Sequence, residues 1–135
     1  MSGPLPLQPA ILNLYCGWIC IMAGVLSGAL IGLFFHDEDW MGGYPSYRRR
    51  LIRLGHISFF GMGLLNILFG LSAEPMHLEQ MGRLVGGWSF VVAAITMPVC
   101  CFLTAWRKPL RHFFPIPVTA SVIAILSVFM GTAHR

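Results

Sequence analysis

Long apolar stretches alternate along the chain with short segments that carry all of its charged residues. A helix needs about 20 apolar residues to cross a hydrocarbon core of about 30 Å, and the stretches 11–35, 54–73, 84–105 and 113–132 are long enough. None of them contains an Asp, Glu, Lys or Arg residue. The pattern predicts an all-α polytopic membrane protein, with residues 1–135 forming a single four-helix transmembrane bundle of up-down topology.

Composition agrees with this pattern and limits where chemistry could take place. Hydrophobic residues make up 56% of the chain and charged residues only 10%, whereas soluble domains average about 25% charged residues. The longest segment between two spans is 36–53, which is too short to form a domain outside the membrane. A catalytic site would therefore have to lie inside the bundle or at its rim, and we find no catalytic residues there and favour a protein that is not an enzyme.

The basic residues gather on one side of the predicted membrane. Seven of them fall in the segments 36–53 and 106–112: Arg48, Arg49, Arg50, Arg53, Arg107, Lys108 and Arg111. The opposite side holds only two. Because short loops rich in Lys and Arg stay in the cytoplasm, we expect a bacterial cytoplasmic membrane protein with both termini outside the cytoplasm. The seven residues then anchor the chain at anionic lipid headgroups, and the net charge of +4 does not indicate nucleic acid as a partner.

Small residues recur at every fourth position in the first span. Gly24, Gly28 and Gly32 form a doubled close-packing motif, which lets a second helix backbone approach closely. The spacing predicts a helix-packing seam. It leaves open whether the partner helix belongs to this chain, to a second copy, or to another membrane subunit.

The second span carries its small and polar residues on one face. His56, Gly63, Asn66 and Gly70 fall on a single arc of a 3.6-residue helix, so this face is expected to point into the bundle. Asn66 lies near the middle of the predicted membrane, where an amide side chain usually forms a hydrogen bond to another helix. We therefore interpret Gly63, Asn66 and Gly70 as helix-packing residues.

Two histidines suggest a cofactor. His56 and His112 lie near the same end of the second and fourth spans, and paired histidines on facing helices are how a bundle ligates a b-type haem. The competing interpretation is that both are ordinary histidines at the membrane surface. The cofactor therefore stays unknown, with haem b as the hypothesis to test, and the sequence indicates no metal site.

Three functional hypotheses follow from these features. The one we favour is a small accessory or assembly subunit of a larger membrane complex, with electron-transfer complexes as the leading class. Its partners would be the lipid bilayer and either other membrane subunits or further copies of the chain, bound through the glycine seams. The alternative is a haem-binding electron-transfer protein that uses His56 and His112. The third is a small carrier or channel built on Asn66 and a kink at Pro98.

Overall fold

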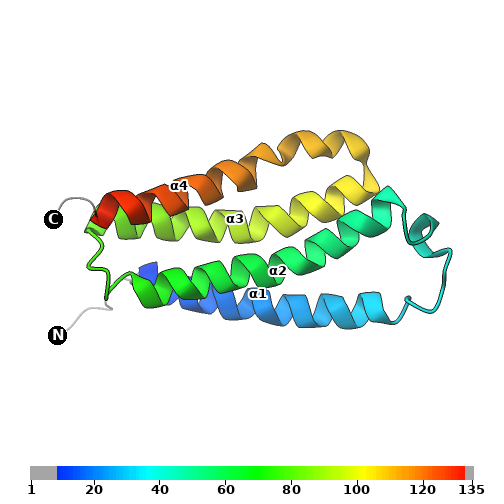
Figure 1. Ribbon diagram of the computed structural model, residues 1–135, viewed down its shortest axis with the longest axis horizontal. Coiled ribbons are helices and arrows are strands. Elements are labelled where there is room, and N and C mark those ends of the chain that lie inside the picture. The colour runs from blue at the N-terminus through cyan, green and yellow to red at the C-terminus, as the bar shows by residue number, and fades with distance from the viewer. Residues whose placement is uncertain (1–8, 133–135) are drawn as a thin grey trace, which may run out of the picture.

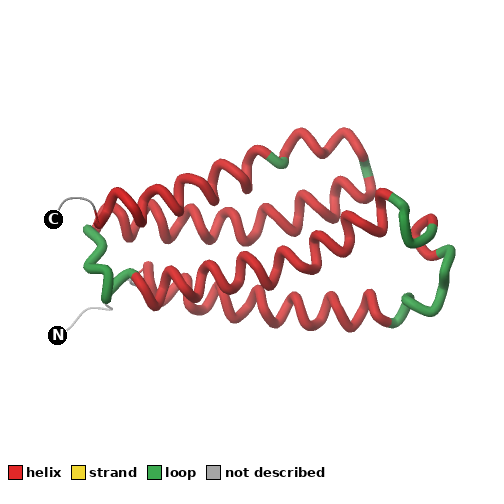
Figure 2. The backbone as a smooth tube through the Cα atoms, in the orientation of Figure 1, coloured by secondary structure: helices red, strands yellow, loops and turns green. Residues whose placement is uncertain are grey.

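Four long helices account for most of the computed structural model, which describes residues 9–132 (Figure 1). The helices are α1 (Pro9–Gly32), α2 (Tyr47–Ser72), α3 (Gln80–Trp106) and α4 (Pro115–Thr132), with two short 3₁₀ helices, η1 (Trp40–Gly42) and η2 (Lys108–Phe113). The rest of the described chain forms turns and loops, without any strand (Figure 2). All four helical segments are long and apolar enough to cross a membrane, so the all-α fold with four candidate spans is confirmed.

The helices pack in chain order, which leaves α1 and α4 at the two edges of the array. Helix α1 contacts α2, α2 contacts α3, and α3 contacts α4, while α1 also touches α3. Among the long helices of the described chain, the backbone of α4 comes close to that of α3 alone. The 33–46 loop and the α3–α4 connection lie at one end, and the 73–79 loop lies at the other, beside the start of α1 and the end of α4 (Figure 1).

Helix α2 begins well before the apolar stretch that predicted it. It starts at Tyr47 instead of residue 54, so the segment that follows Ser46 is helical and not part of a loop. The reason is a capping interaction: Ser46 Oγ accepts a hydrogen bond from the Arg49 backbone N–H at 3.1 Å and donates one to Met41 O at 2.8 Å. Such caps fix where a helix starts, whereas hydrophobicity indicates only the part that suits a hydrocarbon core.

Prolines mark one helix start and one helix interior. Helix α4 begins at Pro115, where a missing backbone N–H costs nothing. Pro98 lies inside α3 and is buried, and the helix continues through it to Trp106. Because proline cannot donate to the carbonyl one turn earlier, we expect α3 to be weakest at this turn.

The inner helices supply most of the packed core. One cluster joins α2, α3 and α4 around Phe69 and Phe90, whose ring centroids lie 5.3 Å apart. A second cluster joins α1, α2 and α3 where Ala93 and Ala94 are almost completely buried. Small side chains on α3 let its neighbours approach closely on both sides, and this positions the polar groups described next.

Candidate functional site

A pair of fully buried asparagines joins α1, α2 and α3. Asn13 and Asn66 are both 0% exposed. The Asn13 side-chain Nδ2 donates to Asn66 Oδ1 at 2.7 Å and to Gly87 O at 3.0 Å. One amide on α1 is therefore bonded to α2 and α3 at once. Sequence reasoning identified Asn66 but missed Asn13, although an amide within the first apolar stretch was a visible signal.

The second asparagine uses its donors in the same way. Asn66 Nδ2 donates to Met62 O at 2.9 Å and to Phe90 O at 3.1 Å. Each amide nitrogen has two hydrogens, so all the donors of the pair are used within the described chain. Of the four side-chain polar atoms of this pair, Asn13 Oδ1 is the one without a partner in the described chain. It lies beside Gly87, where an added Cβ would be 2.8 Å from it. The geometry is that of a helix-joining pair and not of an open polar site.

The predicted packing glycines lie mostly in one seam between α1 and α2 of the same chain. An added Cβ would come within 2.8 Å of the Phe60 ring at Gly24, and within 2.6 Å of the His56 ring at Gly28. At Gly70 it would lie 2.8 Å from Ala10 O. The glycines thus make room for neighbouring rings and backbone atoms.

A close backbone approach of the two helices involves Gly17, a glycine that the fourfold pattern did not include. A Cβ on Gly63 would lie 2.9 Å from Gly17 O, and one on Gly17 would lie 2.7 Å from Gly63 O. At Gly32, by contrast, no heavy atom lies within 4 Å of an added Cβ. Gly17 and Gly63 therefore let the two backbones approach each other closely, and Gly32 has no packing role within the described chain.

The structure does not bring His56 and His112 together. The ring of His56 lies in the α1–α2 seam, where Nδ1 is 3.0 Å from Ser27 Oγ and the ring meets Phe60 edge to face. His112 is exposed on η2, and η2 contacts only α3 and α4. This arrangement gives no support to a shared haem. No group of three His, Cys, Asp or Glu side chains within residues 9–132 could hold a metal ion.

One predicted membrane-anchoring residue is buried within the chain. Arg49 is only 3% exposed, and its guanidinium carbon lies 5.6 Å from the ring centroids of Phe35, Trp40 and Tyr44. Its NH1 group donates to Glu38 O at 3.3 Å. The prediction that Arg49 anchors the chain at lipid headgroups is therefore corrected: its side chain is covered by the 33–46 loop, which it joins to the start of α2.

The other six basic residues remain accessible. Five are exposed, and the sixth, Arg53, is half-buried over the Tyr44 ring, with its guanidinium carbon 4.2 Å from the ring centroid. Arg53 also donates to Tyr44 O at 3.3 Å. These residues stay at one end of the helix array, as the charge pattern indicated.

We expect Arg49→Gln to loosen the 33–46 loop without unfolding the helices. The change removes a buried cation from three aromatic rings, and a desolvated cation–π contact contributes about 2 kcal/mol. Limited proteolysis should then cut this loop faster than in the unchanged protein. The neighbouring exposed residue gives the control, because Arg50→Gln removes the same charge and should leave the cutting rate unchanged. Equal rates for Arg49→Gln and the unchanged protein would show that the aromatic cage does not hold the loop.

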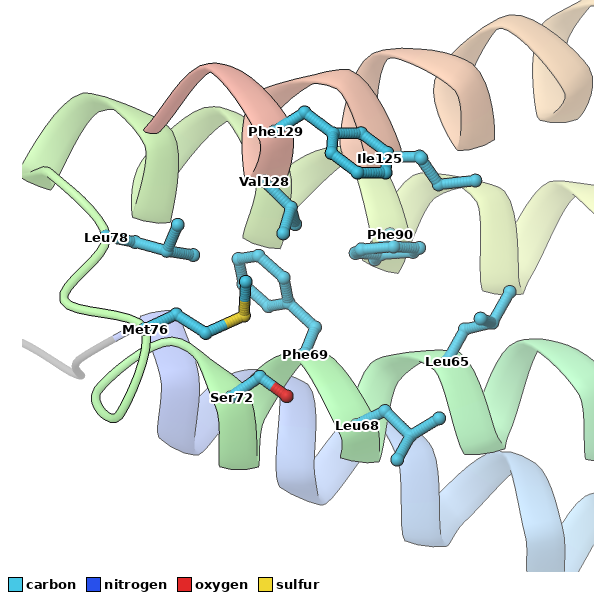
Figure 3. Close-up of a pocket in the computed structure, with 10 residues that line it drawn as sticks. All are labelled: Leu65, Leu68, Phe69, Ser72, Met76, Leu78, Phe90, Ile125, Val128 and Phe129. Carbon is cyan, nitrogen blue, oxygen red and sulfur yellow. The ribbon is translucent and has the colours of Figure 1, made fainter. Parts of the chain in front are cut away.

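An apolar crevice opens between α2, α3 and α4 near the 73–79 loop (Figure 3). It has a volume of about 200 Å³ and lies between Phe69, Phe90 and Phe129, with Met76 and Ser72 at its edge. The crevice lies where α2 and α4 both pack on α3, and its walls come from all three helices and the 73–79 loop. Ser72 is the only lining side chain with a hydrogen-bonding group, so the crevice suits an apolar chain and offers no catalytic group.

Comparison of the chain with models of protein families, with characterised proteins and with solved structures finds no match. Within the described chain, the polar groups at the centre are used in joining helices, and the cationic groups lie at one end.

Proposed function

We propose that the protein is a small integral membrane protein that acts as a non-catalytic accessory or assembly subunit of a larger membrane complex. Electron-transfer complexes are the class to test first. In this proposal the four helices cross a bacterial cytoplasmic membrane in alternating directions, with both termini outside the cytoplasm. The apolar character of all four helices supports the membrane location.

The observation that carries the proposal is the large apolar surface on the two edge helices. In the most apolar stretch of α3, 44% of the residues are buried, against 22% in α1 and 17% in α4. Large side chains such as Trp18 on α1 and Phe129 on α4 are 64% and 67% exposed. Lipid chains can cover such faces, and so can the helices of a partner subunit.

Two glycines on outward faces favour a protein partner over lipid alone. An added Cβ at Gly32 on α1 or at Gly61 on α2 would meet no heavy atom within 4 Å. Ile57 and Leu64, on the same face of α2 as Gly61, are 61% and 53% exposed. Glycine in a membrane helix is useful where another backbone comes close, and no helix of the described chain does so at these two positions.

We expect Gly61→Leu combined with Gly32→Leu to release the chain from its complex. The added side chains would push a closely packed partner helix away, while nothing within the described chain resists them. Native gel electrophoresis after gentle solubilisation should show the unchanged protein in a species larger than the monomer and the double variant as the monomer. Val25→Leu is the control, because it adds bulk on an exposed face without filling a glycine position. A monomeric unchanged protein would overturn the proposal.

The same preparation distinguishes the two other hypotheses. We expect a flat oxidised-minus-reduced visible spectrum. A haem band that is lost in His56→Ala and in His112→Ala would replace the accessory role with haem-based electron transfer. Flux across liposomes that depends on Asn66 would instead favour a carrier or channel, although both donors of that amide are bonded to the chain.

A further inference from the structure

A cavity with basic side chains on its walls lies at the end of the helix array where the arginines gather. It is open on one side, has a volume of about 370 Å³ and is lined by residues of the 33–46 loop, the start of α2, the end of α3 and η2. Arg48 contributes from α2 and Lys108 from η2, and no acidic residue lines the cavity. Two positive charges therefore face one space that contains no carboxylate.

Within residues 9–132, neither the Arg48 guanidinium nor the Lys108 ammonium makes a hydrogen bond or an ion pair. The neighbouring Arg49 and Arg53 donate hydrogen bonds to the carbonyl oxygens of Glu38 and Tyr44, respectively. The side chains of Arg48 and Lys108 are exposed instead. Lys108 Nζ lies 5.9 Å from the centroid of the Tyr47 ring, which also lines the cavity. The ring thus holds the ammonium group near the cavity without neutralising it.

The aromatic residues of the cavity place it at the depth of lipid headgroups. Tyr47 and Trp106 line it and are 38% and 76% exposed. Tyr and Trp gather where the hydrocarbon core meets the headgroups. The cavity lies at the start of α2 and at the end of α3, next to the apolar parts of both helices. A lipid whose headgroup entered the cavity could therefore keep its acyl chains beside these helices.

We propose that this cavity binds the phosphate group of an anionic phospholipid, held between the Arg48 guanidinium and the Lys108 ammonium. Guanidinium groups match the geometry of phosphate oxygens, and the ammonium adds a second point of charge. The inference rests on insertion of the helices in a membrane, and it does not depend on the accessory role.

The test measures binding of phosphatidylglycerol to the purified, delipidated full chain in detergent micelles, with native mass spectrometry counting the bound lipid. Each basic residue near an anionic surface contributes roughly fivefold in affinity. We therefore expect Arg48→Gln combined with Lys108→Gln to weaken binding of the first lipid by roughly 25-fold. Phosphatidylcholine, which carries no net charge, should bind weakly to both proteins.

Two matched variants separate a defined site from a diffuse positive surface. Arg50→Gln combined with Arg111→Gln removes the same charge from exposed positions outside the cavity, and should change the affinity by less than about fivefold. Arg48→Lys combined with Lys108→Arg keeps both charges and should keep most of the binding. Equal losses in the two Gln double variants would overturn the proposal.

A competition experiment separates a lipid headgroup from a free anion. A large excess of inorganic phosphate should leave the bound phosphatidylglycerol in place, because the acyl chains add contacts that phosphate lacks. Displacement by inorganic phosphate would overturn the assignment to lipid and would identify a site for a soluble anion. Failure of the accessory proposal would show in the native gels and would leave this lipid measurement unchanged.

Discussion

Gly63→Val should destabilise the isolated chain by about 3 kcal/mol, at the upper end of the cost of adding bulk to a packed interior. The valine Cβ would lie 2.9 Å from Gly17 O, 3.1 Å from Ile21 Cγ1 and 3.2 Å from Cys20 Cβ. The first of these is a backbone oxygen, so relief requires α1 and α2 to move apart as whole helices. Titration of the detergent-solubilised protein with a denaturing detergent, followed by circular dichroism, measures the change in the free energy of unfolding.

The matched control is two residues away on the same helix. Gly61→Val adds the same side chain where no heavy atom lies within 4 Å, and surface substitutions usually change stability by no more than about 0.5 kcal/mol. Equal destabilisation by both changes would mean that valine weakens α2 itself. No effect from Gly63→Val would contradict the close crossing of α1 and α2.

The glycine pattern shows what helical spacing can and cannot predict. Spacing of four placed Gly24, Gly28 and Gly32 in one row, and the structure puts Gly24 and Gly28 against side chains of α2 but nothing of the described chain against Gly32. The spacing missed Gly17, which does not fall on the row that Gly24 and Gly28 define. The row of residues that meets a neighbour also depends on the angle between the two helices, which the sequence of one helix does not reveal.

The histidine and arginine hypotheses had a related limit. The ends of the apolar stretches place His56, His112 and Arg49 near one end of the predicted bundle. The helical arc predicted that His56 faces the bundle, but it did not predict the neighbour that His56 meets, and no pattern predicted the direction of Arg49. His56 turns into the α1–α2 seam, and Arg49 turns into the aromatic loop, because local packing partners were available there.

Loss of the asparagine pair should give the other large effect. Asn66→Ala removes the hydrogen bonds that α2 makes to Asn13 Nδ2 and to Phe90 O, and leaves both groups buried without that partner. Interhelical hydrogen bonds in membrane proteins contribute about 0.6 kcal/mol on average, and a buried polar group left without a partner costs about 1–3 kcal/mol. We expect a total loss of about 2 kcal/mol in the same unfolding titration.

A double-mutant cycle shows whether the two amides act together. Asn13→Ala should also cost about 2 kcal/mol, but the double variant should cost about 1 kcal/mol less than the sum, because the 2.7 Å bond can be lost only once. Thr119→Val is the control: Thr119 is exposed and bonds only to carbonyls of its own helix, so its loss should change little. Strict additivity of the Asn13 and Asn66 changes would contradict the pairing. Normal stability with altered solute flux in Asn66→Ala would instead identify the amide as part of a transport path.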